Sequence, residues 1–214
     1  MLKTAGHVKK HYIPCCVIFE DFKQRGRRQT TLQDYMTSIE AIVSKGLKPM
    51  PGLPNGLDPI TDIDDANIFR GDMLEVLAEI FFKAFTNSPQ VGLTDYAPVP
   101  LEEDYGVDGI GVNATGKKCA VQVKYRGNPE DLVLYSEMAR TYTSGVIQMG
   151  IPLEGPDCLY VFTTANGVSV SCQEVFKKML RVLNREIIGN EINNNVSFWE
   201  MAYKEISDTL IGGA

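Results

Sequence analysis

The sequence predicts a mixed α/β fold, in which a central sheet is flanked by helices. Two short stretches with alternating side chains surround a polar, Gly-containing loop, and this pattern is typical of a β-hairpin. The segments before and after this hairpin place apolar side chains at helical spacing. A further apolar stretch, residues 158–164, reads as a buried strand. The resulting order of helix, hairpin, helix, strand and helix is that of a mixed α/β core.

Residues 1–65 are expected to form a separate N-terminal α/β extension. Residues 12–19 are apolar enough for a short buried strand, and residues 31–45 place apolar side chains on one side of a helix. Residues 47–62 are rich in proline and glycine and read as a linker or extended loop. We therefore expect the main core at residues 66–214.

The core is expected to open with a helix over residues 72–85, followed by three strands and a hairpin loop over residues 114–118. The strands are predicted at residues 91–98, 106–113 and 119–125. The later elements are predicted to be a helix at 130–143, the strand at 158–164, a turn at 165–167 with a short strand after it, and helices at 173–188 and 197–211. In the last helix, Phe198, Trp199 and Tyr203 share one side, which favours packing in the core or in a dimer.

Charge is distributed unevenly over the 214 residues. Residues 1–30 hold seven Lys and Arg residues against two acidic residues, a net of +5, so the remainder carries −11 of the total of −6. An acidic total argues against a protein that coats nucleic acid tightly and without specificity. It does not exclude a nucleic-acid enzyme, because carboxylates that bind metal ions add negative charge. One loop is basic and contains Lys23, Arg25, Arg27 and Arg28. It either contacts DNA phosphates or is a solvated segment.

The five cysteines indicate a reducing compartment. Their number is odd, none lie at C-x-x-C spacing, and Cys15 and Cys16 are adjacent, which a normal disulfide disfavours. With only His7 and His11 available, no structural zinc cluster is visible. No apolar run approaches the roughly 18 residues that span a bilayer. We expect a cytoplasmic protein with buried free thiols and no membrane partner.

The predicted hairpin brings three polar side chains together. Side chains alternate along a strand, so Gln122 and Lys124 point to the same face. If Asn113 faces Cys119, then Asp108 lies opposite Lys124, and the three side chains of Asp108, Gln122 and Lys124 share one small patch. Carboxylate and amide oxygens suit Mg²⁺ or Mn²⁺, and an ammonium group stabilises charge that develops on phosphorus. The alternative is an exposed cross-strand pair of Asp108 and Lys124.

Two motifs in this region resemble the PD-(D/E)xK nuclease superfamily, and they are most similar to its Mrr-like restriction endonuclease branch, in which Gln often replaces the acidic residue before the catalytic lysine. The resemblance covers about residues 70–172. It implies a restriction-endonuclease-like core, in which a central mixed sheet is flanked by helices. The residues that carry it are Gly71-Asp72-Met73-Leu74-Glu75, Gly106-Val107-Asp108-Gly109-Ile110 and Val121-Gln122-Val123-Lys124-Tyr125-Arg126.

The resemblance implies a role for each matching residue. Asp108 is expected to be the main metal ligand, completed by Gln122 and the backbone carbonyl of Val123. Lys124 is expected to be the catalytic lysine, and Glu75 to reach the metal directly or through water. Because Gln122 stands where the common pattern has an acidic residue, one negative charge is missing, and weaker metal binding is expected.

Three other residues near these motifs have two interpretations each. Glu79 lies one helical turn after Glu75, so it is an alternative or additional carboxylate. Tyr125 and Arg126 follow the catalytic motif and either contact the DNA backbone or serve a structural role.

The main hypothesis is a Mg²⁺- or Mn²⁺-dependent endonuclease that hydrolyses DNA phosphodiester bonds. It would be of restriction, phage or mobile-element type, or the nuclease module of a longer helicase–nuclease chain. Cutting both strands would require a homodimer or two visits by a monomer. The first alternative is a catalytically weak or inactive nuclease fold that acts as a DNA-binding or assembly subunit. The second is an unrelated α/β protein in which Asp108 and Lys124 merely pair.

Overall fold

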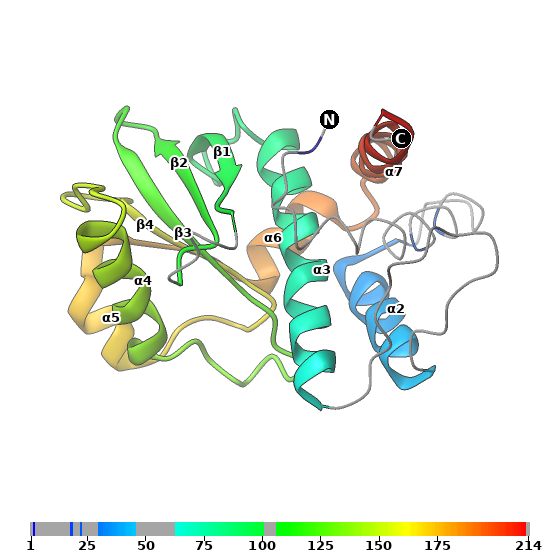
Figure 1. Cartoon of the computed structure of the whole chain (residues 1–214), viewed down its shortest axis with the longest axis horizontal. Coiled ribbons are helices and arrows are strands. Elements are labelled where there is room, and N and C mark those ends of the chain that lie inside the picture. The colour runs from blue at the N-terminus through cyan, green and yellow to red at the C-terminus, as the bar shows by residue number, and fades with distance from the viewer. Residues whose placement is uncertain are drawn as a thin grey trace.

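The protein has an α/β core, in which a five-stranded mixed sheet carries helices on both faces (Figure 1). The computed structural model describes Leu2, Ile18 and Phe22, together with residues 30–45, 63–100 and 106–212. This architecture confirms the α/β class predicted from the sequence and is compatible with a restriction-endonuclease-like core.

The strands follow one another across the sheet in sequence order. The first three form an antiparallel meander, and the last two run parallel to the third. Every residue of β4 is buried, as expected for a strand covered on both faces. The five strands are β1 (Leu93–Pro98), β2 (Gly109–Asn113), β3 (Lys118–Lys124), β4 (Leu159–Thr163) and β5 (Leu180–Leu183).

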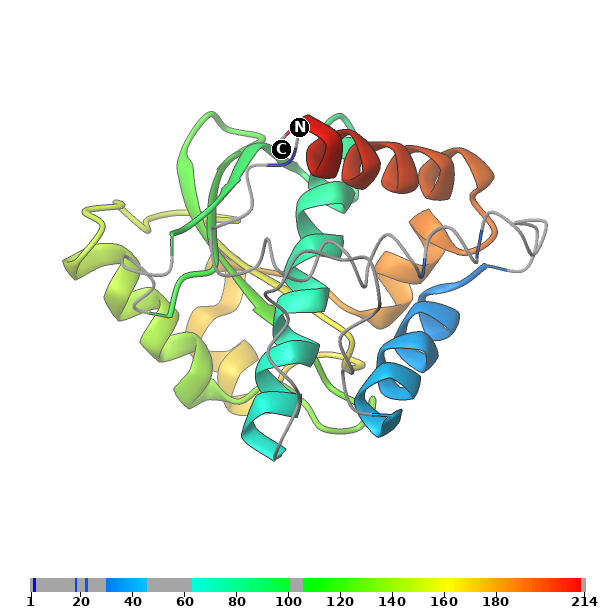
Figure 2. The ribbon, with the colours of Figure 1, turned by 45° about the vertical axis from the view of Figure 1, so that its right-hand side comes forward.

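One face of the sheet is covered by α3 (Ile63–Ala84), which lies between the sheet and α2 (Leu32–Lys45) (Figure 1). The rings of Phe81 and Phe82 pack on Phe162 of β4, with centroids 5.2 Å and 5.7 Å apart. The helices α6 (Arg185–Ile192) and α7 (Val196–Gly212) extend this side, and Figure 2 shows α7 across one end of α3. Most of α3 is therefore buried.

The opposite face is covered by α4 (Tyr135–Ile147) and α5 (Val170–Phe176). Gly145 allows α4 to approach closely, because a Cβ atom there would lie 2.9 Å from Leu153 and 3.4 Å from Ala120 of β3. The side chains of β3 alternate between the two faces. Odd-numbered residues join the cluster around α3, and Ala120 joins the cluster around α4.

The helix predicted at residues 173–188 is wrong. This stretch contains the end of α5, a short 3₁₀ turn (Lys177–Met179), the strand β5 and the start of α6. The chain leaves the helical region at Lys177, where φ is 44°, and β5 then pairs in parallel with β4. The Asn184 side chain accepts a hydrogen bond from the Ile187 backbone and begins α6 as an N-cap.

Several other predicted boundaries differ from the structure. The helix predicted at 72–85 begins nine residues earlier, at Ile63, and the helix predicted at 130–143 spans 135–147. The short strand expected after residue 167 is a single bridge between Val133 and Val168. The residues predicted as strand at 106–108 precede β2, and Gly106 has a φ of 101°, which suits glycine rather than a regular strand.

Much of the N-terminal prediction lies outside the described residues, including the linker at 47–62. Of the strand predicted at 12–19, only Ile18 is described, and it is helical rather than extended. Ile18 and Phe22 are both buried, and this spacing of four residues fits one side of a helix. The division at residue 65 stays a prediction. It falls within α3, and α2 packs into the same buried cluster as α3.

Other expectations are met where the structure describes them. Phe198 and Trp199 of α7 lie in the core, and Cys119, Cys158 and Cys172 are buried free thiols. Cys15 and Cys16 lie outside the described residues. Among the described helices, none combines the length and apolar character that crossing a membrane requires.

Candidate metal centre

Asp108 lies directly before β2, and its buried carboxylate contacts the adjacent strand β3. One carboxylate oxygen accepts hydrogen bonds from the side-chain nitrogen of Gln122 and from the backbone N–H of Val123, the latter at 2.5 Å. The Asp108 backbone is also fixed, because its N–H donates to Val121 at 3.0 Å and its carbonyl accepts from Val99 at 3.0 Å. β3 thus holds the carboxylate, while the backbone of Asp108 is bonded both to β3 and to the residue after β1.

The strand register differs from the predicted one by two residues. Gly109 pairs with Val121, and Ile110 pairs with Ala120, so Asp108 does not lie opposite Lys124. Asn113 causes the difference. Its side-chain oxygen accepts hydrogen bonds from the backbone N–H groups of Thr115 and Lys117, both at 3.0 Å, which closes a shorter turn than the predicted five-residue loop. A shift of two residues preserves the face, and Asp108 therefore still meets Gln122.

The amide of Gln122 bridges Asp108 and α4. Its oxygen accepts a hydrogen bond of 2.5 Å from the hydroxyl of Thr141, which is itself fully buried. The same hydroxyl lies 3.2 Å from the backbone carbonyl of Glu137. The sequence motifs gave no sign of Thr141, because nothing in a helical threonine identifies its partner on a neighbouring strand. We call Asp108, Gln122 and Thr141 the buried relay.

The backbone carbonyl of Val123 faces the side of β3 on which Asp108 lies. The carbonyl of Val121 accepts from Asp108 on this side, whereas the carbonyl of Lys124 accepts from Thr164 on the β4 side. Backbone groups alternate along a strand, and the N–H and C=O of one residue point the same way, so the Val123 carbonyl points with its N–H toward Asp108. The pairing of β2 with β3 ends at Val121, two residues before Val123.

Lys124 is half-buried on the same face of β3 as Gln122. It forms no ion pair with any residue of the described segments. The pKa of Glu137 lies below its usual value. Burial raises this pKa, but the hydrogen bond from Arg126 lowers it, and the positive charge of Lys124 adds a smaller lowering. Glu137 is held by Arg126 through two contacts of 2.7 Å. The ammonium of Lys124 therefore has an acidic neighbour that is already paired elsewhere.

The charges of Glu75 and Glu79 of α3 and of Asp108 all act on Tyr96 of β1. Burial raises the pKa of Tyr96 well above its usual value, and the charges of Glu75, Asp108 and Glu79, in that order, add to the rise. Glu79 is buried and Glu75 is half-buried. Each of the three carboxylates is thus near enough to Tyr96 for its charge to act on the phenol.

Tyr96 owes its position to an irregularity in β1. The pairing with β2 shifts between Thr94 and Ala97, which places one extra residue in β1, and Asp95 within it has a φ of 51°. The Tyr96 ring stacks on Phe82, with centroids 4.6 Å apart. A Cβ atom at Gly109 would overlap this ring, so glycine is required there. Tyr96 was not predicted from the sequence, and Gly109 is the local signal for it.

The donor set around Asp108 fits a hard divalent cation in its chemistry. Carboxylate, amide and backbone carbonyl oxygens are the ligands that Mg²⁺ and Mn²⁺ prefer. Two observations limit the fit. The nitrogen of the Gln122 amide, not its oxygen, is directed at Asp108. In addition, no group of three or more His, Cys, Asp or Glu side chains within the described part of the chain is arranged to hold a metal ion.

The structure describes only two of the residues that were predicted to contact DNA, Tyr125 and Arg126. Lys23, Arg25, Arg27 and Arg28 lie outside the described residues. The hydroxyl of Tyr125 donates to Glu40 at 2.8 Å, and Arg126 is the partner of Glu137, so both have a structural role within the chain.

Comparison with family models, with curated proteins and with solved structures finds no match for this chain. The family resemblance therefore rests on the motifs described above.

Proposed function

We propose that this protein is a metal-dependent endonuclease that hydrolyses DNA phosphodiester bonds in the cytoplasm, with Mg²⁺ or Mn²⁺ as cofactor. The observation that supports it is the position of the Asp108 carboxylate. It is held against Gln122 and Val123, while Lys124 follows on the same face as Gln122, and the charges of Glu75 and Glu79 act on Tyr96 together with that of Asp108.

Asp108 would be the principal ligand of the ion, together with the carbonyl of Val123 and with Glu75 or Glu79. A bound divalent ion polarises the scissile phosphate and lowers the pKa of a bound water. Lys124 can stabilise the negative charge that develops on the phosphate oxygens, because no described residue neutralises its ammonium by an ion pair. The buried walls around Asp108 strengthen these interactions by excluding water.

Gln122 would serve as a ligand only with its oxygen turned toward Asp108. Thr141 is compatible with both orientations of the amide, since a hydroxyl both donates and accepts hydrogen bonds. It donates to the Gln122 oxygen in the structure, and with the amide turned it would accept from the nitrogen while donating to the Glu137 carbonyl at 3.2 Å. With a divalent ion bound between the Gln122 oxygen and Asp108, the turned amide would leave no buried polar atom unsatisfied.

The proposal is tested by incubating the protein with supercoiled, linear, single-stranded and branched DNA in Mg²⁺ or Mn²⁺. We expect cleavage of at least one substrate. Asp108→Ala and Lys124→Ala should each reduce the rate by about 100-fold or more, because each removes a group that acts on the reacting phosphate. Lys118→Ala is the matched control, since Lys118 lies exposed at the other end of the same strand.

Equal rates for the wild type and for the Asp108 and Lys124 variants would rule out this site, and cleavage that survives chelation of divalent ions would rule out the metal. Circular dichroism of each variant separates loss of chemistry from loss of fold.

A nuclease-fold subunit that binds DNA without cutting it is the second candidate. Its specific support is the hydrogen bond from the Gln122 nitrogen to Asp108, which occupies the carboxylate with a protein donor. DNA binding by gel shift, without cleavage of any substrate and without a change in melting temperature on adding Mn²⁺, would favour this candidate over the enzyme.

A further inference from the structure

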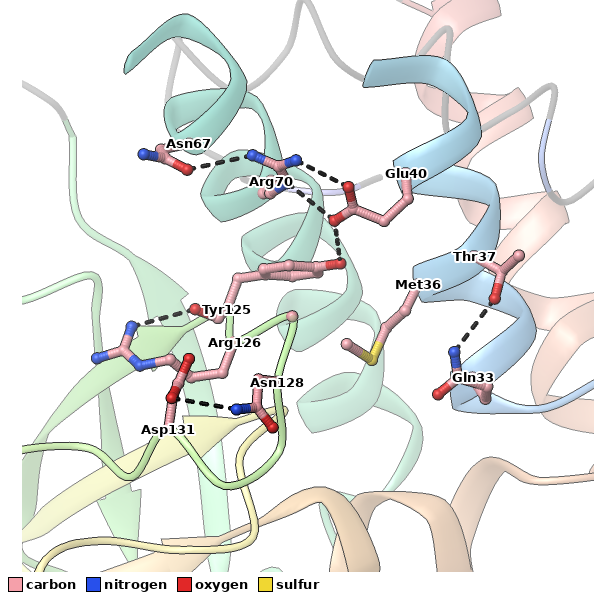
Figure 3. A pocket seen from close by; sticks show the side chains of 11 residues that line it. Gln33, Met36, Thr37, Glu40, Asn67, Arg70, Tyr125, Arg126, Asn128 and Asp131 are labelled. Atoms are coloured by element: carbon pink, nitrogen blue, oxygen red, sulfur yellow. Dashed lines mark hydrogen bonds and ion pairs between the residues drawn. The ribbon is translucent and has the colours of Figure 1, made fainter. Parts of the chain in front are cut away.

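A polar pocket of about 570 Å³ lies beside the end of β3, on the side of α2 and α3 (Figure 3). Its volume is in the range of sites that bind small organic groups. Three segments far apart in the sequence form its walls: α2, the first turns of α3 and the loop after β3. The lining residues are Gln33, Met36, Thr37 and Glu40 of α2, Asn67 and Arg70 of α3, and Tyr125, Arg126, Gly127, Asn128 and Asp131 of the loop.

The charges in this pocket are balanced. Arg70 binds both carboxylate oxygens of Glu40 at 2.8 Å, and the hydroxyl of Tyr125 donates to the same carboxylate. The hydrogen bond from Arg70 holds the pKa of Glu40 below its usual value, so this pair is charged at neutral pH. Arg126 and Asp131 add one charge of each sign, and Arg126 is already paired with Glu137. Such a lining favours a neutral polar ligand over an anion.

The remaining walls suit a flat heteroaromatic group. Three side-chain amides line the pocket, those of Gln33, Asn67 and Asn128, and amides pair with the donor and acceptor edges of nucleobases. Figure 3 shows the Tyr125 ring and the Met36 thioether at the same space. Aromatic rings stack with unpaired bases, and the flexible thioether of methionine adapts to flat apolar surfaces.

The pocket and the candidate metal centre use consecutive residues at the end of β3. Tyr125 directly follows Lys124, and Val123 lies two residues earlier, which is about 7 Å along an extended strand. Lys124 and Tyr125 point to opposite faces, so the two sites lie on either side of the end of β3. The hydroxyl of Thr164 accepts from the Arg126 N–H at 2.6 Å and donates to the Arg126 carbonyl at 3.0 Å, which fixes the loop to β4.

We propose that this pocket holds one unstacked nucleobase of the DNA strand, next to the phosphodiester bond that is cleaved. The proposal rests on the endonuclease function above and specifies its substrate class, DNA with an unpaired nucleotide at the cleavage site. A base inside a regular duplex is stacked and paired, and it would have to leave the helix to enter such a pocket.

The test uses DNA binding without divalent metal, so that cleavage plays no part. The probe is a duplex deoxyoligonucleotide with one unpaired nucleotide, in which 2-aminopurine or an abasic nucleotide is placed at the unpaired position and at each neighbouring position in turn. The test variant is Asn67→Trp, which fills the pocket from α3. The control is Ile68→Trp, because Ile68 is the adjacent exposed residue of the same helix and does not line the pocket.

For the wild type and for Ile68→Trp, we expect the 2-aminopurine fluorescence to change at one position, and an abasic nucleotide there to weaken binding by about 10-fold, in the range of one lost base–aromatic contact. Asn67→Trp should lose the position-specific change and should no longer distinguish the abasic strand. Equal binding of all abasic strands by the wild type, or identical behaviour of the two tryptophan variants, would overturn the proposal. Melting temperatures show that both variants are folded.

The outcomes for the pocket and for the enzyme are separable. Base-specific binding without metal-dependent cleavage would support the pocket and reject the endonuclease. Metal-dependent cleavage with no position-specific base effect would reject the pocket and leave the endonuclease intact. Failure to bind any of these probes would also reject the pocket, and cleavage of the other DNA substrates would then test the enzyme.

Discussion

Two polar clusters flank β3, and they differ in exposure. In the buried relay, Asp108, Gln122 and Thr141 are exposed by 9%, 3% and 0%. In the cluster around Glu40, the side chains of Arg70 and Glu40 are exposed by 18% and 42%. A hydrogen bond lost in the relay leaves a buried group unsatisfied, whereas water replaces a lost partner of Glu40. The same kind of contact should therefore have large effects on one side of β3 and small effects on the other.

The largest contrast is expected from Gln→Glu substitutions on the two sides. Gln122→Glu places a second carboxylate against Asp108, so the pKa of one of the two must rise. A rise of two to three pKa units lowers the free energy of unfolding at pH 7 by about 2–4 kcal/mol. The penalty is absent below the unfolded-state pKa of about 4.3 and grows as the pH rises toward the raised folded-state pKa.

Urea unfolding at pH 4 and pH 7 measures this penalty. The matched control is Gln33→Glu, which makes the same change at an exposed residue of α2 and should shift stability by less than about 0.5 kcal/mol. With Mg²⁺ added, we expect a larger gain in stability for Gln122→Glu than for the wild type, because the ion neutralises the second carboxylate. A variant that is fully stable at pH 7 without metal would contradict the buried contact.

The next contrast is between Thr→Val substitutions at two separate sites, one on each side of β3. Thr141→Val removes the hydroxyl that donates to Gln122 in the buried relay, and it should cost about 1–3 kcal/mol. Thr37→Val removes an exposed hydroxyl on α2, which accepts a hydrogen bond from Gln33, and should cost less than about 0.5 kcal/mol. Thr141→Ser keeps the hydroxyl and should restore most of the difference. Similar losses for the two valine variants in urea unfolding would show that the relay is not selectively stabilising.

The smallest effect is expected from Arg70→Met, which removes the partner of Glu40. The pair is partly exposed, so the loss should stay below about 1 kcal/mol. Because Arg70 lowers the pKa of Glu40, the advantage of the wild type is present above the unfolded-state pKa of about 4.3 and is lost as the pH falls through the folded-state pKa. Urea midpoints from pH 3 to pH 7 test this, and a constant difference across that range would contradict it.

Sequence patterns predicted the fold better where elements are long and regular. The helices at 31–45 and 197–211 and the strand at 158–164 agree with α2, α7 and β4 within a few residues. The prediction of one helix over residues 173–188 was wrong because it extended a helical pattern across Lys177 and Asn184. There, a positive φ and an N-cap divide the stretch, and pairing with β4 makes its middle a strand. These features depend on tertiary contacts, which spacing alone does not reveal.

At the candidate site, alternation along β3 correctly placed Gln122 on the face that Asp108 reaches, because this property is local. The register was wrong, because it depends on the side-chain hydrogen bonds of Asn113 in the turn. Thr141 and Tyr96 were missed, since each reaches the site from another element. The Glu40–Arg70 pair was also missed, because its members are 30 residues apart and belong to different helices.

The two hydrogen bonds between Thr164 and the backbone of Arg126 have a consequence for the products of the proposed reaction. These two hydrogen bonds tie the residue after Tyr125 to the end of β4, which restrains where Tyr125 lies relative to Asp108. If both proposals hold, the distance from the pocket to the candidate metal centre sets which phosphodiester bond is cut relative to the base in the pocket. The DNA fragments would then share one offset from the unpaired base, and sequencing their ends would reveal a single sharp position.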